Sequence, residues 1–281
     1  MEKILKKHFL IFVLPTLLVF LVVFIVPFIL GIILSFSKFT TIFNAKFVGL
    51  SNYVIAFSKG QGFSKAFAFT SVFTIVSIIT VNVFAFTIAL ILTRKIRATN
   101  LFRSVFFMPN LIGGIVLGYT WQVMLDAILL QFGQTLLANA KYGFIGLVLL
   151  MNWQMIGYMM VIYIAGLQNV PQELIEAAKI DGADSKDTLF NVTIPMVMPS
   201  ITICLFLTLA NSFKLYDQNL ALTAGAPLKK TQMLAMNIVD TMFSRNGFEG
   251  VGQAKAVVFF IIVAVIAYLQ LRFTRDKEVE N

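Results

Sequence analysis

The sequence has little charge, one cysteine and one histidine, and these shortages exclude several kinds of chemistry. Of its 281 residues, 12% are charged and 59% are apolar. The single cysteine excludes a disulfide within the chain. Cys204 stands in an apolar run, where a thiol packs as a small hydrophobic group. His8 follows Lys6 and Lys7, so we interpret it as part of an interfacial charge cluster rather than as a metal ligand or an acid–base group.

Motifs for the common catalytic sites are absent from the sequence. It holds no H-E-x-x-H and no G-x-S-x-G, which removes the usual metal and serine machinery of a membrane-embedded enzyme. It holds no G-x-x-x-x-G-K-[ST], so it does not bind ATP through a P-loop. Asp126 and Asp217 stand at the ends of apolar runs, and no acidic residue lies inside one. This absence disfavours an ion-coupled secondary transporter, which would place an acidic side chain deep in a span.

Long apolar runs dominate what the sequence does contain. The mean hydropathy is +0.88, and a soluble domain of this length cannot hide so much apolar surface. A membrane-crossing helix needs about 20 apolar residues, and six runs meet that requirement approximately. We therefore predict an all-α integral membrane protein, with residues 1–281 forming a single transmembrane domain. The predicted spans are about 9–34, 67–93, 104–125, 144–167, 199–216 and 251–271.

The net charge of +9 is distributed between the apolar runs. Nucleic-acid binding is disfavoured, because charges that flank apolar runs set membrane orientation and meet lipid headgroups. Basic residues are densest in three short segments, 1–8, 94–103 and 272–281. Six spans place all three on one side, which the positive-inside rule makes cytoplasmic. Both termini and the polar stretch 168–198 are therefore predicted to be cytoplasmic.

The segment 169–195 predicts a helix–turn–helix element between the fourth and fifth spans. Pro171 suits a first helical position, and acidic residues follow where the helix dipole favours them. Ala177 and Ala178 give the helix a face of small residues, and Gly182 suits the position after its C-terminus. Asp184 or Ser185 can cap a second short helix, from Lys186 to about Val192. On these grounds alone, an ordinary amphipathic surface loop remains the alternative.

This segment resembles the EAA loop of permease subunits from binding-protein-dependent ABC importers. The family pattern is Glu-Ala-Ala, three residues, Gly, nine residues, an aliphatic, one residue, an aliphatic and Pro. The sequence keeps that spacing with Glu176–Ala178, Gly182, Val192, Ile194 and Pro195. Valine and isoleucine replace the commoner isoleucine and leucine, which is a mild departure.

Other elements extend the resemblance over nearly the whole chain. Residues 47–53 are similar to the "vGLdNY" element of carbohydrate-uptake permeases, residues 102–109 to their "fRtlfflP" element, and residues 222–227 to "LTgGgP", with alanine at two usual glycines. The chain is identified as a member of the carbohydrate branch, and it resembles the first of the paired sugar permeases of the maltose and multiple-sugar type. This resemblance implies the type I ABC importer permease fold.

The resemblance also implies partners and a location. Such a permease pairs with a second permease subunit, two ATPase subunits and an extracellular sugar-binding protein in a bacterial or archaeal cytoplasmic membrane. The partner ATPases bind ATP and Mg, so this chain is expected to be no enzyme and to hold no cofactor. Its contact with lipid follows from the spans. The residues expected to transmit ATPase movement are Glu173, Glu176, Ala177, Ala178, Asp181 and Gly182.

A substrate path is expected where polar side chains share a face of a span, because such groups usually face a partner or a cavity. Thr208, Asn211 and Ser212 do so in the fifth span, and Gln154 and Tyr158 in the fourth. By resemblance, the corresponding helices of the maltose permease line its sugar site. Hydrogen bonding between helices is the alternative use of these five side chains.

The cargo is expected to be a neutral sugar or oligosaccharide. A phosphate-bearing cargo such as glycerol-phosphate would favour Arg or Lys along the path, and Lys214 is the only basic residue near that face of the fifth span. Another polar solute remains the alternative within the same class of importer.

Overall fold

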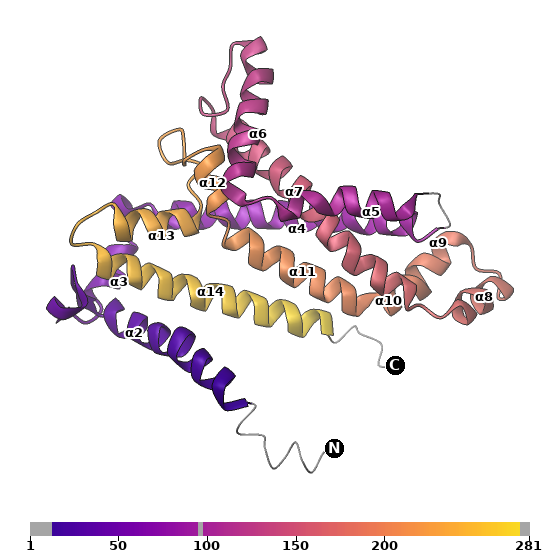
Figure 1. Cartoon of the computed structure of the whole chain (residues 1–281), viewed down its shortest axis with the longest axis horizontal. Coiled ribbons are helices and arrows are strands. Elements are labelled where there is room, and N and C mark those ends of the chain that lie inside the picture. The colour runs from indigo at the N-terminus through magenta and orange to yellow at the C-terminus, as the bar shows by residue number, and fades with distance from the viewer. Residues whose placement is uncertain (1–12, 95–97, 276–281) are drawn as a thin grey trace. The chain divides into compact units, whose positions relative to one another are not determined.

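The computed structural model describes residues 13–94 and 98–275 (Figure 1). These residues divide into two compact units. The first joins residues 13–63 to Ile238–Ile261, and the second joins Ser64–Asn237 to the described residues from Ile262 onward. The cluster predicted at residues 1–8, including His8, lies outside the described residues, as do Lys95–Arg97 and most of the charged tail. The single-domain organisation of the chain stays a prediction.

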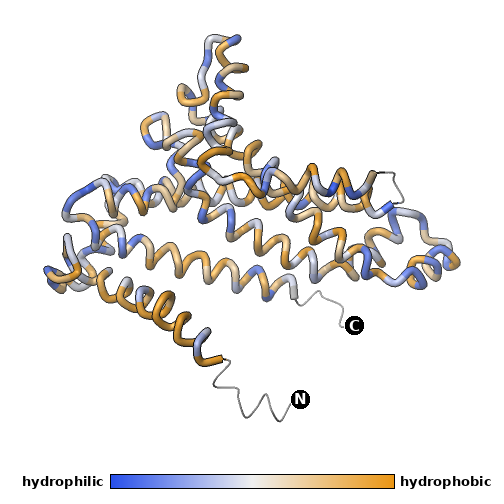
Figure 2. Tube along the Cα trace, in the orientation of Figure 1, coloured by the Kyte–Doolittle hydropathy of each residue, from blue (hydrophilic) through white to orange (hydrophobic). Residues whose placement is uncertain are grey.

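The first unit is built on one long apolar helix. Residues Val13–Ser35 are helical and include a wide π-turn, η1, and the helix α2. Figure 2 shows that α2 is hydrophobic along nearly its whole length. A short antiparallel hairpin follows, in which Ser37 lies opposite Phe47 and Lys38 opposite Lys46. The elements are η1 Leu21–Ile25, α2 Val26–Ser35, β1 Ser37–Lys38, η2 Ile42–Asn44, β2 Lys46–Phe47, α3 Ser51–Ala56 and η3 Lys59–Gln61, with the end of α13 (Leu234–Phe243) and the start of α14 (Glu249–Arg275).

Side-chain hydrogen bonds fix the hairpin to the end of α2. The buried Asn52 amide donates to the carbonyl oxygens of Ser35 and Ser37, at 2.9 Å each. The Ser35 and Tyr53 hydroxyls lie 2.6 Å apart. Gly250, at the start of α14, lies so close to Ser37 that a Cβ there would overlap the Ser37 carbonyl oxygen. The chain therefore leaves α2 in one defined direction.

A buried lysine lies inside the predicted sixth span. Lys255 of α14 is fully buried, and its ammonium group donates to the Thr241 hydroxyl at 2.6 Å and to the Gln61 carbonyl oxygen at 3.3 Å. It also lies 5.9 Å from the centre of the Phe63 ring. A buried ammonium group requires such partners because desolvation is costly. These contacts join η3 to α13 and α14 within the first unit.

The second unit contains most of the long helices. Its elements are α4 Phe63–Leu92, α5 Thr99–Phe107, η4 Met108–Leu111, α6 Gly114–Leu129, η5 Leu130–Phe132, α7 Ala140–Gln168, α8 Gln172–Ile180, α9 Ser185–Thr188, η6 Leu189–Thr193, α10 Ile194–Met196, α11 Met198–Phe213 and α12 Asp217–Leu222, with the start of α13 and the end of α14.

The core of the second unit surrounds α7, of which twelve residues are buried. Leu147, Leu150, Met159 and Met160 of α7 are fully buried. Small residues allow closer approach at one crossing. At Gly157, a Cβ would overlap the carbonyl of Phe106 and lie 2.8 Å from the next backbone nitrogen. The end of α5 therefore crosses α7 in direct backbone contact, as small residues commonly permit in membrane helices.

The predicted third span, 104–125, is wrong as a single helix. Its first residues belong to α5, and η4 and an extended Gly113 separate α5 from α6. Pro109 lies in η4, and proline both removes a backbone donor and clashes with the preceding helical turn. The crossing helix begins only at Gly114, and the helical residues Gly114–Phe132 are long and apolar enough to span a membrane.

The remaining spans confirm the predicted class. Among the described residues, five helices are long and apolar enough to cross a membrane, and a sixth is counted if Ser185–Met196 and Met198–Phe213 form one span bent by 70°. The four others are Val13–Ser35, Phe63–Leu92, Ala140–Gln168 and Glu249–Thr274. The all-α membrane fold expected from the sequence is therefore confirmed.

Candidate coupling and substrate sites

The predicted helix–turn–helix is present, and a glycine forms the turn that ends its first helix. Helix α8 begins one residue later than predicted, because Pro171 is its N-cap rather than its first residue. Gly182 has φ +87°, a left-handed conformation that disfavours residues with a side chain. It lets the next amide, of Ala183, donate to the Ala178 carbonyl oxygen at 2.9 Å, which ends the helix as a glycine C-cap does.

The second helix is longer than predicted. Asp184 caps α9 by accepting from the backbone amides of Lys186 and Asp187, at 2.7 and 2.8 Å. The helical path then continues through η6 and α10 to Met196, beyond the expected end near Val192. Pro195 lies within this path, and the wide π-turn η6 precedes it. Because a proline clashes with the carbonyl one turn earlier, a locally wider turn explains how the helix passes it.

The small-residue face of α8 lines a groove. A cavity of about 350 Å³ lies between α8 and the following helix, where Leu174, Ala177, Ala178 and Asp181 face a wall formed by Asn191, Val192, Pro195 and Met196. Of the six residues predicted to transmit ATPase movement, Ala177, Ala178 and Asp181 line this groove. Glu173, Glu176 and Gly182 are exposed and lie outside its lining.

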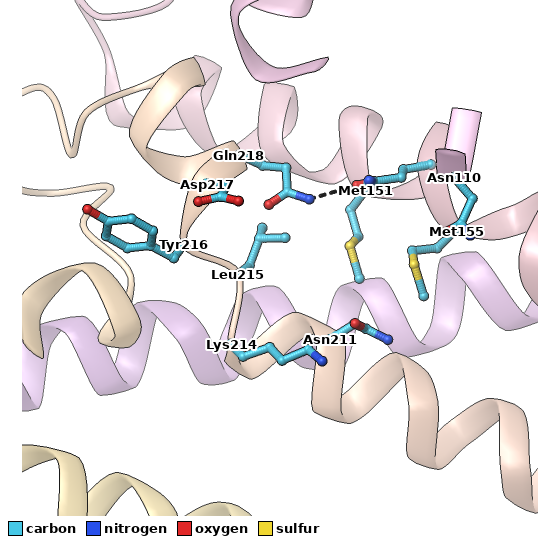
Figure 3. A pocket seen from close by; sticks show the side chains of 10 residues that line it. Asn110, Met151, Met155, Asn211, Lys214, Leu215, Tyr216, Asp217 and Gln218 are labelled. Atoms are coloured by element: carbon cyan, nitrogen blue, oxygen red, sulfur yellow. Dashed lines mark hydrogen bonds between the residues drawn. The ribbon is translucent and has the colours of Figure 1, made fainter. Parts of the chain in front are cut away.

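A second cavity lies where α7, η4, α11 and α12 meet (Figure 3). It measures about 270 Å³. Four carboxamide side chains and two charged side chains line it, together with Met151 and Met155 from α7. The side-chain amide of Gln218 donates to the side-chain oxygen Oε1 of Gln154 at 2.8 Å, and this bond joins α12 to α7. The polar lining residues are Asn110, Gln154, Asn211, Lys214, Asp217 and Gln218.

Two of the five predicted path residues line this cavity, Gln154 and Asn211. The Asn211 amide donates to the Leu207 carbonyl oxygen of its own helix at 2.8 Å. Tyr158 is half-buried, with its ring centre 6.3 Å from that of Phe107. It does not belong to the lining.

Thr208 and Ser212 are fully buried and lie outside the cavity lining. The Thr208 hydroxyl donates to the Cys204 carbonyl oxygen at 2.8 Å and accepts from the Asn82 amide at 3.3 Å. The Tyr163 hydroxyl donates to the other end of the Asn82 amide at 2.7 Å. For Thr208, the structure thus contains the helix–helix bonding that the sequence left as the alternative. The Ser212 hydroxyl has no hydrogen-bond partner among residues 13–94 and 98–275.

Sequence reasoning missed Asn110, Asp217 and Gln218. Asn110 directly follows Pro109 in η4. The proline was the available signal, because it marks a helix break at which a polar residue can lie. The other two begin α12, which packs on α6 at two glycines. A Cβ on Gly114 would lie 2.8 Å from the Asp217 side chain, and one on Gly118 would lie 2.7 Å from Ala221. This G-x-x-x-G spacing is the available signal for that contact.

The fold resembles that of ABC-importer membrane subunits. A chain in the crystal structure of a bacterial ABC transporter involved in the import of the acidic polysaccharide alginate superposes with a TM-score of 0.81, at 17% identity and with 98% of each chain covered. At that identity the likeness shows the fold alone, and it confirms the type I importer permease fold implied by the EAA resemblance.

The chain belongs to the family described as the binding-protein-dependent transport system inner membrane component, which matches residues 97–278. It is 44% identical to the probable starch degradation products transport system permease AmyD of Thermoanaerobacterium thermosulfurigenes, over 96% of this chain and 94% of the relative. It is 32% identical to the multiple sugar-binding transport system permease MsmF of Streptococcus mutans, over 87% of each chain. The chain is thus a multi-pass membrane permease of the carbohydrate type.

Proposed function

We propose that this chain is the pore subunit of an importer that moves a sugar or oligosaccharide into the cell. The observation that carries the proposal is the chain's 44% identity, over nearly its full length, to a permease named for starch degradation products. The cavity between α7 and α12 supports it. Carboxamides can donate and accept hydrogen bonds at once, which suits the neighbouring hydroxyl groups of a sugar.

The charges in the cavity favour a neutral cargo. Lys214 and Asp217 both line it, so their formal charges cancel. Lys214 is the one observation that favours glycerol-phosphate or a similar anion as a second candidate cargo, because a phosphate needs a cationic partner. Asp217 would repel that anion at close range.

The energy is proposed to come from ATP bound with Mg by two partner ATPase subunits, which contact the groove between α8 and α10. Ala177 and Ala178 allow close approach by a protein surface. The exposed Glu173 and Glu176 offer charges at its margin, and Gly182 sets the turn. A second permease subunit completes the pore, and an extracellular sugar-binding protein delivers cargo. Transport would then be a population shift between two arrangements of the pore.

This arrangement requires both termini and residues 168–198 to be cytoplasmic, in the cytoplasmic membrane of a bacterium or archaeon. Single cysteines placed at exposed positions in 173–190, with Cys204 replaced by serine, test it in intact cells. An impermeant thiol reagent is expected to leave them unlabelled until the membrane is opened. Labelling in intact cells would contradict the proposed topology.

The transport experiment uses the complete complex in proteoliposomes that contain ATP. The test cargoes are radiolabelled maltooligosaccharide and glycerol-3-phosphate, each with its binding protein. Oligosaccharide uptake that requires both ATP and the ATPase subunits is expected. Glycerol-3-phosphate uptake without sugar uptake would replace the cargo assignment, and sugar uptake without ATPase subunits would overturn the mechanism.

A further inference from the structure

The hairpin that follows α2 presents apolar side chains to its surroundings. Phe43 is fully exposed, Phe47 is 80% exposed and Ile42 is 65% exposed. Exposed apolar patches of this kind mark contact surfaces. Most of α2 is also apolar and exposed, as expected of a lipid-facing helix, and a single residue, Phe36, separates α2 from the hairpin. The exposed apolar surface therefore continues from the span into the hairpin.

Two lysines of the same hairpin oppose each other. Lys38 and Lys46 are partners in the strand register, an arrangement in which like charges are destabilising. Both line a cavity of about 300 Å³, together with Phe39, Thr40 and Asn44. Neither ammonium group has an ion-pair partner within the described part of the chain. An anion placed between them would turn this repulsion into attraction.

The hairpin is held in this shape before any ligand binds. The side-chain oxygen Oδ1 of Asn44 accepts from the backbone amides of Thr40 and Thr41 at 3.0 Å each, and its side-chain Nδ2 donates to the Thr40 hydroxyl at 2.7 Å. Asn52 holds the base of the hairpin through its two bonds to the end of α2. A site that is already ordered loses less entropy on binding.

The dimensions place the lysines at the level of lipid headgroups. The helix Val13–Ser35 has 23 residues and is about 34 Å long, enough to cross a hydrocarbon core of about 30 Å. Each strand of the hairpin has two residues and extends about 7 Å. A headgroup layer is roughly 5–8 Å thick, so the hairpin fits within it.

We propose that residues 37–47 bind an anionic phospholipid, with its phosphate between Lys38 and Lys46 and with Phe43 inserted into the leaflet where α2 ends. A basic and aromatic surface of this kind suits a lipid interface. The ligand chemistry is a phosphate anion, which a free phosphate ion could also supply. The proposal goes beyond transport and depends on neither the cargo nor the direction of movement.

The first test measures lipid binding to the complete complex by native mass spectrometry, with phosphatidylglycerol as the probe and phosphatidylcholine as the neutral reference. The double variant Lys38→Gln/Lys46→Gln is expected to lower phosphatidylglycerol affinity about 30-fold, since each lysine near an anionic surface contributes roughly a factor of five. The matched control is Lys59→Gln/Lys65→Gln, which removes the same charge from exposed positions. Equal losses in the two variants would overturn the site. If inorganic phosphate competes for the site as well as phosphatidylglycerol does, the site binds a free ion, and this would overturn the lipid assignment.

The second test measures the depth of Phe43 in the bilayer. A nitroxide attached to Phe43→Cys, in the Cys204→Ser background and in lipid nanodiscs, is expected to relax more with oxygen than with a water-soluble nickel complex. Preferential relaxation by nickel would show a hairpin in water, available to an acidic protein partner, and would overturn insertion. Neither measurement reads transport, so a failure here is separable from a failure of the proposed function.

Discussion

The groove on α8 and the cavity at α12 are both candidate functional sites, but they are assembled differently. The groove is formed by residues between Leu174 and Met196, so short-range sequence determines it. The cavity collects residues from Asn110 to Gln218 on four elements. A local site tolerates movement of distant helices, whereas an assembled site depends on every crossing that builds it. Changes to crossings and changes to turns should therefore affect the two sites separately.

The largest effect is expected from Gly157→Ala. The added methyl group would overlap the Phe106 carbonyl oxygen, and the helices must separate. We expect a loss of about 3–5 kcal/mol of stability, the range typical of severe core disruption. Thermal unfolding of the purified complex measures it. Gly60→Ala is the control, because no atom lies within 4 Å of a Cβ there. ATPase binding through the α8 groove should persist in whatever fraction remains folded. If the α8 groove and the α12 cavity were lost in parallel, the two sites would not respond separately as expected.

Gly182→Val is expected to have a smaller effect than Gly157→Ala, and to affect the α8 groove rather than a helix crossing. Valine at φ +87° costs about 1–3 kcal/mol of backbone strain, which should weaken binding of the ATPase subunits by roughly tenfold to a hundredfold. Gly182→Asn is the control, since asparagine tolerates the left-handed region. Binding is measured by titrating ATPase subunits onto the permease pair, and membrane insertion should be unchanged. If valine and asparagine behave alike, the turn does not set the groove.

Gln218→Ala should affect the cavity alone. It removes the bond to Gln154, worth about 0.5–1.5 kcal/mol, and the apparent KM for sugar should rise roughly two- to tenfold. The exposed Gln131→Ala, on η5, is the matched control. Uptake kinetics in proteoliposomes measure the change. An altered ATPase affinity in Gln218→Ala would show that the two sites are not independent.

The smallest effect is expected from Lys214→Gln. Because the favoured cargo is neutral, sugar uptake should stay within about twofold of the unchanged complex, the scale of a single exposed charge. The same assay run at low and high salt should give the same result. A loss of tenfold or more would show that Lys214 contacts an anionic group of the cargo.

The sequence predicted the local site better than the assembled one, for physical reasons. The turn at Gly182 and the cap at Asp184 depend on residues within one helical turn, so spacing alone located them. The cavity depends on how α12 packs against α6, which no neighbouring residue specifies. Thr208 shows the limit of predicting a substrate path from polar residues on one helix face. Such a residue can bond to another helix instead, as Thr208 does to Asn82. The broken third span shows a similar limit, because hydropathy alone does not register the effect of Pro109.

The bend between α10 and α11 has a mechanical consequence. The helical path from Ser185 to Met196 meets α11 at 70°, so a displacement along the first helix has only a small component along the axis of the second. Most of it is perpendicular to α11. A partner that pushes on the α8–α10 segment would therefore move the Val197 end of α11 sideways and tilt the helix, rather than slide it lengthwise. Such a tilt changes the angle at which the other end of α11, with Asn211 and Lys214, meets the cavity.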